Sequence, residues 1–500
     1  MAVVLTKSSW CDVLKVALVS LRRSKIKNGL WCRYFGQPVP KTHPHLLKEG
    51  QVTPGITEDE YRRRRIALFR NALQQRKSGA PKDMIFIFPS ASKVFMSYDI
   101  PYTFRQNTEF LYLCGFLEPD SLLLIFNNPN DGNPYADPKS VLFVPPKNPE
   151  RELWDGPCSG VEGTLSFTGI DAAYTVDELE SFLYEYKKNH SRYTVWYNFN
   201  KPVQKKIHDR FLTRFIQESR NCNFEITDKL VQNLRLIKSE DEIELMKNSV
   251  DIASESLVKV MEFSQPGINE SMLVAKMDYE CRTRGAQYLA YPPVVAGGNR
   301  ANTVHYVNNN QIVNDGELVL MDAGCELHGY TSDLTRTWPV SGTFSKVQEE
   351  VYNAVLRCQE LCLKMCRKTF SLDDIYTEML AILGCELKAL GLIESSLSGS
   401  KLMATARKFC PHHVGHYLGM DVHDTPSVSR RIHLEPGMIV TIEPGIYIPE
   451  TNMMVPAEFR GIGIRIEDNV LITNSSPVIL SSNCPKRVED IEDIMNSNRR

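Results

Sequence analysis

The chain has 500 residues, of which 24% are charged and 42% are hydrophobic, and its formal net charge at pH 7 is −2. This length allows two or three domains with an ample core, and the composition is ordinary for a soluble globular protein. The small net charge argues against a nucleic-acid-binding protein. The thirteen cysteines are scattered without a CxxC pair, which favours free thiols in a reducing compartment over a disulfide framework.

Residues 1–40 differ in composition from the rest of the chain. Before residue 34 there are seven basic side chains and one acidic one, and the apolar stretch 13–21 is interrupted by Lys15. No window reaches the roughly eighteen apolar residues of a membrane-spanning helix. A basic, acid-poor, amphipathic N-terminus predicts a mitochondrial transit peptide, and so a matrix protein with a cytoplasmic pool as a further option. A secretory signal and a plain basic tail are the alternatives.

Residues 50–228 have the pattern of one α/β domain. Short apolar runs predict buried strands at 84–88, 122–126 and 141–144. Spacing typical of helices occurs at 58–75, 177–186 and 203–214. We find no cluster of catalytic residue types in this domain. The aromatic-rich segment 99–115 is interpreted as domain core and interface.

A second domain is predicted at 229–484, followed by a tail at 485–500 that carries no specific signal. Ser239 and Glu242 have the spacing of a capping box and open the first helix of this domain. Further helices are predicted from Asn269 to near Gly285, at 345–367 and at 371–390. Strand-like segments lie between and after them, so the domain is mixed α+β, with helices on a largely antiparallel sheet. Cys358, Cys362 and Cys366 share a helical face, which predicts core packing rather than a metal site.

Residues 318–339 have the pattern of a β-hairpin, and this segment carries the most informative side chains. The apolar run 318–321 ends in Asp322, glycines flank the turn region, and a second strand rich in Thr carries Asp333. An isolated carboxylate in an apolar strand is costly to bury, so it needs a cation or dense hydrogen bonding. The hairpin therefore predicts a site for a hard cation, with a pair of ordinary turn aspartates as the alternative.

Four other segments place polar side chains where the strand pattern predicts burial. These are the histidine-rich segment 412–424, the strand 438–448 with Glu443, the alternating strand 461–473 with Arg465 and Glu467 on one face, and the turn 296–306 before His305. Together with the hairpin they supply one histidine and four carboxylates, namely Asp322, Asp333, His416, Glu443 and Glu467. Four close carboxylates repel one another, and two divalent cations would cancel their charge. An oxygen-rich set with one imidazole suits Mn²⁺, with Co²⁺ or Zn²⁺ as alternatives.

The order Asp, Asp, His, Glu, Glu resembles the ligand set of the pita-bread metallopeptidases. The surrounding segments are similar to the Xaa-Pro aminopeptidase (aminopeptidase P) family: HHVGHYLGMDVHD at 412–424, IEPGIYIP at 442–449 and GIRIED at 463–468. Segments 99–116 and 142–156 of the first domain resemble the same family. The resemblance covers roughly residues 40–485, and the basic leader is similar to that of a mitochondrial member. It implies a pita-bread (creatinase/aminopeptidase-like) catalytic domain preceded by an α/β aminopeptidase P N-terminal domain.

The resemblance also implies a role for each of the five residues. Asp322 would bind one metal ion, while His416 and Glu443 would bind a second one. Asp333 and Glu467 would bridge the two ions. The water or hydroxide between the ions would be the nucleophile, and Glu443 would be the general base that passes its proton to the leaving proline nitrogen.

The remaining site residues follow from the same resemblance. His305 and His423 would hold the substrate carbonyl and stabilise the tetrahedral intermediate, and His412 and Tyr291 would line the substrate site. Arg465 and Tyr447 would form the network around Asp322. His413 and His433 are assigned no role.

The implied reaction is release of the N-terminal residue from peptides with proline in the second position, by an enzyme that is usually a homodimer. A prolidase-type Xaa-Pro dipeptidase is the nearest alternative, because it shares all five ligands. A methionine aminopeptidase would not need the large first domain. A non-catalytic pita-bread binding protein would be expected to have lost ligands.

Overall fold

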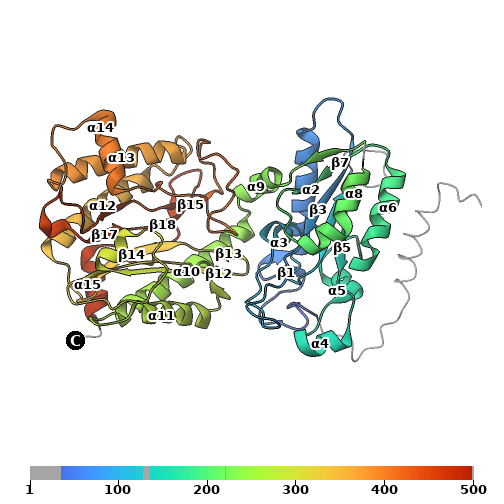
Figure 1. Cartoon of the computed structure of the whole chain (residues 1–500), viewed down its shortest axis with the longest axis horizontal. Helices are drawn as coiled ribbons and strands as arrows, with labels where there is room; N and C mark the ends of the chain where they lie inside the picture. Colours follow the sequence, from blue (N-terminus) through green and yellow to red (C-terminus); the bar gives the residue numbers. More distant parts are fainter. Residues whose placement is uncertain (1–34, 128–135, 220, 498–500) are drawn as a thin grey trace, which may run out of the picture. The chain divides into compact units, whose positions relative to one another are not determined.

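The computed structural model describes residues 35–127, 136–219 and 221–497. Residues 1–34, most of the predicted transit peptide, lie outside this range. The chain divides into two compact units, one ending at Leu230 and the other beginning at Val231 (Figure 1). The domain limits 50–228 and 229–484 stay a prediction. Among the described residues, no helix has the length and hydrophobicity that crossing a bilayer would require.

The first unit is built on a six-stranded mixed sheet. Its strand order is β6-β5-β4-β3-β7-β8. The strands are β3 (Asp83–Pro89), β4 (Leu122–Phe126), β5 (Lys139–Val144), β6 (Ala172–Thr175), β7 (Tyr193–Trp196) and β8 (Asn223–Glu225). β4 is antiparallel to both of its neighbours, and the other pairs are parallel. The three apolar runs predicted as strands are β3, β4 and β5.

Helices cover this sheet because its side chains alternate between two apolar faces. Ile85 and Ile87 belong to a core cluster that includes Leu183 of helix α6. Phe86 points to the other face, where its ring lies 6.1 Å from that of Phe69 on α2. The helical segments are α2 (Glu58–Gln74), α3 (Thr108–Cys114), α4 (Pro149–Asp155), α5 (Gly160–Phe167), α6 (Leu179–Asn189), α7 (Lys205–Ile207) and α8 (Thr213–Glu218), and a short hairpin joins β1 (Gln51–Thr53) to β2 (Ile56–Thr57). In the segment predicted as a helix at 203–214, residues His208–Leu212 form a π-helix between α7 and α8.

The second unit begins with helices that start where the sequence predicted. Ser239, Ser345 and Ser371 each form a capping box, and Asn269 caps a fourth helix. α9 (Asp228–Leu236) crosses the boundary between the two units. The helices that follow it are α10 (Glu240–Phe263), α11 (Glu270–Thr283), α12 (Lys346–Lys364), α13 (Leu372–Ala389), α14 (Gly399–Phe409) and α15 (Val488–Ser497). The three cysteines predicted to share a helical face are buried, although Cys366 lies just beyond the end of α12.

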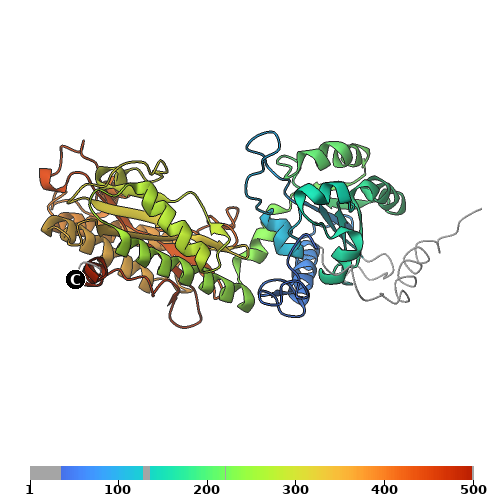
Figure 2. The same cartoon turned by 90° about the horizontal axis from the view of Figure 1, so that it is seen from below.

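Three of these helices, α9, α14 and α15, were not predicted. α15 lies in the supposed tail and buries Val488, Ile491 and Met495. It packs against α10 and α12 (Figure 2, dark red). Four acidic residues lie between its apolar positions, so its short amphipathic pattern resembled a charged tail.

The strands of the second unit form four small antiparallel sheets. Their orders are β10-β11-β14, β13-β12-β9, β15-β18-β19 and β16-β17. The strands are β9 (Tyr288–Leu289), β10 (Val294–Gly297), β11 (Leu318–Ala323), β12 (Cys325–Leu327), β13 (Tyr330–Thr331), β14 (Leu334–Pro339), β15 (Ile439–Ile442), β16 (Gly445–Ile448), β17 (Ile462–Arg465), β18 (Asp468–Leu471) and β19 (Val478–Ile479). α10 packs against β12 to β14, and α12 packs against β15 to β17. A bridge between Thr335 and Glu467 links two of the sheets.

The second arm of the predicted hairpin and the predicted strands 438–448 and 461–473 are each broken at a carboxylate. Asp333 separates β13 from β14, Glu443 separates β15 from β16, and Glu467 separates β17 from β18. The prediction of one continuous alternating strand at 461–473 was therefore wrong at Ile466 and Glu467. At the hairpin the chains approach so closely that a Cβ on Gly324 would lie 1.8 Å from the Ser332 carbonyl oxygen. Because these carboxylates lie outside regular strands, their direction is not set by the alternation of strand side chains between the two faces of a sheet.

Candidate active site

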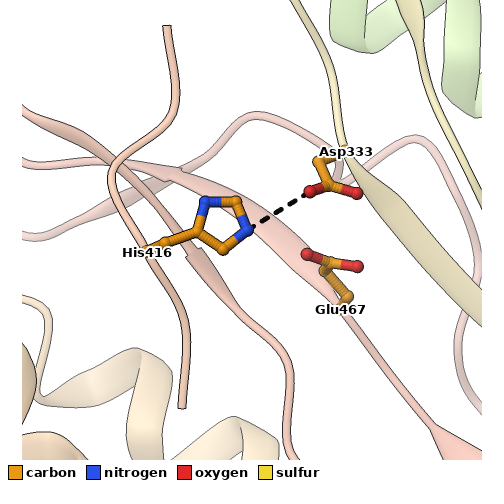
Figure 3. Close-up of side chains that lie close together, drawn as sticks. All are labelled: Asp333, His416 and Glu467. Atoms are coloured by element: carbon orange, nitrogen blue, oxygen red, sulfur yellow. Dashed lines mark ion pairs between the residues drawn. The ribbon is translucent and has the colours of Figure 1, made fainter. Parts of the chain in front are cut away.

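Asp333, His416 and Glu467 point toward one another from three separate segments (Figure 3). One ligand atom of each lies within 4.8 Å of those of the other two, and all three residues are buried. His416 Nε2 is 3.3 Å from Asp333 Oδ2 and 3.6 Å from Glu443 Oε1. A buried imidazole nitrogen therefore faces carboxylates from two strand breaks.

Asp322 joins this cluster from the end of β11. The Tyr291 hydroxyl lies 2.6 Å from Asp322 Oδ1 and also contacts Asp333. A phenol has one proton to donate, so it can donate to only one of the two carboxylates at a time. The structure thus brings the five predicted ligands together, and it places the Tyr291 hydroxyl on two of them. A contact between Tyr291 and substrate stays a prediction.

The protonation behaviour of the cluster reflects a surplus of negative charge. Burial, and then repulsion from Asp322, raises the pKa of Asp333. Burial and repulsion from Asp333 raise the pKa of Glu467 well above its usual value. Burial raises the pKa of Glu443 to about 7, although His416 acts in the opposite direction. Burial alone would lower the pKa of His416, but Asp333 and Glu443 raise it to about 9.

The donor set fits divalent cations. The His416 ring donates from Nδ1 to the Tyr417 carbonyl at 3.0 Å, which leaves the Nε2 lone pair directed at the carboxylates once the ring is neutral. Oxygen ligands with one imidazole suit first-row divalent metals. Bound cations would also relieve the repulsion that raises the carboxyl pKa values, because each ligand binds in its deprotonated form.

A pH-dependent effect of metal on stability follows. A carboxyl whose pKa is higher in the folded than in the unfolded chain stabilises the metal-free protein as the pH falls through that folded pKa. Metal binding requires the deprotonated carboxylate, which prevails above that pKa. We expect the rise in Tm caused by Mn²⁺ to be largest above pH 7, the region of the Glu443 pKa, and to shrink steadily toward pH 5.5. Thermal unfolding with and without Mn²⁺, from pH 5.5 to pH 8, measures this rise in Tm. An equal rise in Tm at pH 5.5 and pH 8 would contradict the assignment.

A chain of hydrogen bonds runs outward from Asp322. Arg465 Nη2 donates to Asp322 Oδ2 at 2.6 Å, and Arg465 Nη1 donates to the Tyr447 hydroxyl at 2.8 Å. That hydroxyl lies 2.8 Å from His412 Nε2, while His412 Nδ1 is 2.9 Å from the His413 carbonyl. These distances suit one tautomer, in which Nδ1 of His412 is the donor and Nε2 accepts from Tyr447. The predicted network around Asp322 is thus present and includes His412.

His423 and His305 lie on the exposed side of the cluster. The His423 ring packs edge to face on the His416 ring, with centroids 4.5 Å apart. Partial loss of hydration at the ring, and then the charge of His416 and His305, lowers the pKa of His423. Both His423 and His305 are exposed. The loop that carries His423 is held in place by the next residue, Asp424, whose carboxylate accepts a hydrogen bond from Lys238 Nζ at 3.3 Å. Neither exposed histidine is among the side chains that converge as metal ligands.

His413 has a structural environment, as the sequence suggested. Its ring stacks on that of Tyr376 at 4.5 Å, and Nδ1 bonds to the Gly415 carbonyl at 3.0 Å. At Gly415 a Cβ would lie 2.0 Å from the Thr441 carbonyl oxygen, so only glycine lets the loop before His416 approach β15 so closely.

Sequence reasoning missed several polar residues that hold the ligands, among them Thr335 and Asn469. Thr335 Oγ1 donates to Glu467 Oε2 at 2.6 Å, and Arg465 Nε donates to that same hydroxyl at 3.1 Å. Asn469, fully buried, accepts from the Asp333 backbone N–H at 3.2 Å. Thr335 lies in the strand that follows Asp333, but its contact with Glu467 joins residues 132 positions apart and has no local signal. For Asn469 no pattern along the chain indicated a contact 136 residues away.

The chain matches two known protein families. Metallopeptidase family M24 matches residues 244–474, which include all five clustered side chains. The aminopeptidase P N-terminal domain matches residues 61–196. Xaa-Pro aminopeptidase 3 of Homo sapiens is 46% identical over 486 residues, which cover 97% of this chain and 94% of that protein. This chain belongs to the aminopeptidase P family.

Other members of the aminopeptidase P family are similar to this chain in sequence or structure over nearly its whole length. Intermediate cleaving peptidase 55, mitochondrial, of Arabidopsis thaliana is 38% identical and covers 93% of this chain and 88% of its own length. The crystal structure of Icp55 from Saccharomyces cerevisiae has a TM-score of 0.78 at 30% identity, over 90% of this chain and 100% of that one. Zn-substituted Escherichia coli aminopeptidase P in complex with product has a TM-score of 0.80 at 32% identity, over 89% and 99%. The predicted fold class is confirmed, and Asp333, His416 and Glu467 form a candidate divalent-metal site within the M24 metallopeptidase region.

Proposed function

We propose that this chain is a metal-dependent Xaa-Pro aminopeptidase, which releases the N-terminal residue from peptides that have proline in the second position. The convergence of four carboxylates from strand ends and strand breaks, namely Asp322, Asp333, Glu443 and Glu467, on His416 from the loop before β15 carries the proposal. Its support comes from relatives that share the whole chain, including human Xaa-Pro aminopeptidase 3. The catalytic roles of individual residues are part of the proposal.

The site is proposed to hold two divalent cations, with Mn²⁺ favoured over Co²⁺ and Zn²⁺ by the oxygen-rich donors. Asp322 would serve one ion, His416 and Glu443 the other, and Asp333 and Glu467 both. When bound, the cations supply Lewis-acid activation of water and of the substrate carbonyl.

The residues around the metal site have distinct proposed tasks. Glu443 takes the proton of the attacking water, and Thr441 holds its carboxylate with a hydrogen bond of 3.3 Å. Glu443 then delivers the proton to the proline nitrogen, which leaves as a secondary amine. His423 and His305, on the exposed side, donate hydrogen bonds to the oxygen that gains charge. The Arg465 guanidinium holds Asp322 in place and offsets part of the negative charge.

Replacing His423 by alanine is expected to lower kcat by about 10²–10³-fold while Mn²⁺ affinity stays within about twofold, because the lost donor acts on the transition state. His413→Ala is the matched control, since its ring stacks on Tyr376 outside the cluster, and its kcat should stay near that of the natural protein. Steady-state kinetics and a metal competition assay measure both. Loss of metal from the His423 variant would place that residue among the ligands.

The substrate class is tested by comparing Ala-Pro-Ala, Ala-Ala-Ala and Ala-Pro, with products identified by mass. Free alanine and Pro-Ala should form from the first peptide in Mn²⁺, and a chelator should stop the reaction. Cleavage of Ala-Pro without cleavage of Ala-Pro-Ala would assign a prolidase-type dipeptidase instead. No cleavage of any peptide by metal-loaded protein would favour the non-catalytic alternative.

A mitochondrial location and a homodimer are further parts of the proposal. The location is supported by the basic N-terminal sequence and by a relative whose name states that it is mitochondrial. Fusion of residues 1–40 to a fluorescent protein tests the targeting, and light scattering tests the dimer. A diffuse fluorescent signal, or the mass of a monomer, would contradict the respective part.

A further inference from the structure

A second buried charge cluster lies behind the metal-ligand cluster, and the proposed mechanism does not use it. Its centre is Arg336 on β14, a fully buried arginine in a strand of apolar and Thr side chains. Each of the five guanidinium N–H groups has an acceptor. The acceptors are the carbonyls of Pro485, Thr335, Glu467 and Cys484 and a carboxylate oxygen of Asp468, at 2.6–3.0 Å.

The Asp468 carboxylate is saturated in the same way. Oδ1 accepts from Arg336 and from Ser481, and Oδ2 accepts from Gln359 and from Lys486. The Arg336 and Asp468 side chains are both buried, and every polar atom of the two groups has a partner, so their geometry is closely determined.

This cluster is bonded directly to the backbone of a proposed metal ligand. Arg336 Nη1 donates to the Glu467 carbonyl at 2.6 Å and to the Thr335 carbonyl at 3.0 Å. The Glu467 N–H donates to that same Thr335 carbonyl at 3.0 Å. Glu467 lies at a strand break, so regular ladder hydrogen bonds do not hold it on both sides. The guanidinium replaces them.

The energetics favour a role in geometry over a role in stability. A buried ion pair often contributes no more to stability than apolar side chains of similar volume would, because two charges lose their hydration. Four carboxylates that repel one another, by contrast, must be held in place before any cation arrives. Residues behind metal ligands commonly serve this purpose.

We propose, building on the proposed metal-dependent function, that Arg336 is a positioning residue. Together with Asp468 and the segment 484–486, it holds the backbone of Glu467 where its carboxylate can bind a cation. The supposed tail thereby acquires a role, because Pro485 and Lys486 close the cluster from the C-terminal side. Arg336 acts through Glu467 and touches neither substrate nor metal.

The test uses the full chain and measures Mn²⁺ affinity without substrate, by competition with a fluorescent chelator at a temperature well below Tm. Arg336→Lys keeps the charge and loses the fork that spans two carbonyls. We expect it to weaken Mn²⁺ binding by about 10–100-fold, and to lower kcat more than it changes KM. Lys486→Met removes only the outer partner of Asp468 and should weaken binding less, by a factor of a few.

Trp338→Phe is the matched control for lost stability. Trp338 lies on the same strand, is equally buried, and donates from Nε1 to Ser264 at 3.1 Å, away from the ligands. It should lower Tm and leave Mn²⁺ affinity unchanged. If Trp338→Phe weakened Mn²⁺ binding as much as Arg336→Lys, general loosening would explain the effect and the proposal would fail.

The remaining outcomes are also decisive. A folded Arg336→Lys variant with natural Mn²⁺ affinity would overturn the proposal. If that variant did not fold, Lys486→Met decides, with weaker binding supporting the role and unchanged binding refuting it. Failure of the unsubstituted chain itself to bind Mn²⁺ or to cleave Ala-Pro-Ala would instead refute the proposed function.

Discussion

Asp333→Asn is expected to lower kcat/KM for Ala-Pro-Ala by at least about 10³-fold, which corresponds to about 4 kcal/mol of transition-state stabilisation. Asp333 is proposed to bridge both cations, and a neutral amide is a poor bridging ligand. The same change removes one of four mutually repelling carboxylates, so the metal-free protein should unfold at the same or a higher temperature. Kinetics, metal affinity and thermal unfolding measured on one preparation separate these effects.

Asp278→Asn supplies the control for Asp333→Asn. Asp278 lies on the surface of α11, where it pairs with Arg282, and its amide variant should keep natural activity. Near-natural turnover in Asp333→Asn would refute the bridging role. A large fall in its Tm without metal would show that Asp333 stabilises the fold in a way that like-charge repulsion does not explain.

Glu443→Gln is expected to lower kcat by about 10²–10⁴-fold, the range for loss of a general base. The amide keeps the volume of the side chain and one oxygen donor, so metal binding should weaken less than turnover falls. Single-turnover kinetics at saturating Mn²⁺ isolates the chemical step from metal loss. Glu443→Asp is the companion variant, and its shorter carboxylate should restore part of the rate. A Glu443→Gln variant with natural kcat would remove this residue from the proton-transfer step.

Much of the fold could be predicted because its signals are local. The serines at 239, 345 and 371 cap helices through contacts three residues away, and such spacing is visible in a sequence. The apolar runs of β3, β4 and β5 are visible for the same reason. α15 was missed because its apolar face is short and its stability comes from packing on α10 and α12, which lie far away in the chain.

The five clustered side chains could also be predicted. Asp322, Glu443 and Glu467 lie beside apolar runs, where a charged group needs a partner, and the order of all five resembles the ligand set of the family. The strand breaks that direct them toward one point could not be predicted. Glu467 was assigned to a continuous strand, whereas in the structure its backbone is held by Thr335 and Arg336. Those contacts join residues more than 130 positions apart. Arg336 itself was a visible signal, as a lone charge in an apolar strand, but only its five acceptors reveal its use.

The most direct test of the whole account is to count the metal ions bound per chain by native mass spectrometry, during a Mn²⁺ titration in which Ala-Pro-Ala hydrolysis is followed in parallel. We predict two ions per chain, with full activity only when both are bound, and loss of both properties in Asp333→Asn. Full activity in a chain stripped of metal by a chelator would contradict the account, as would binding of two ions that leaves Asp333→Asn and the natural protein equally active.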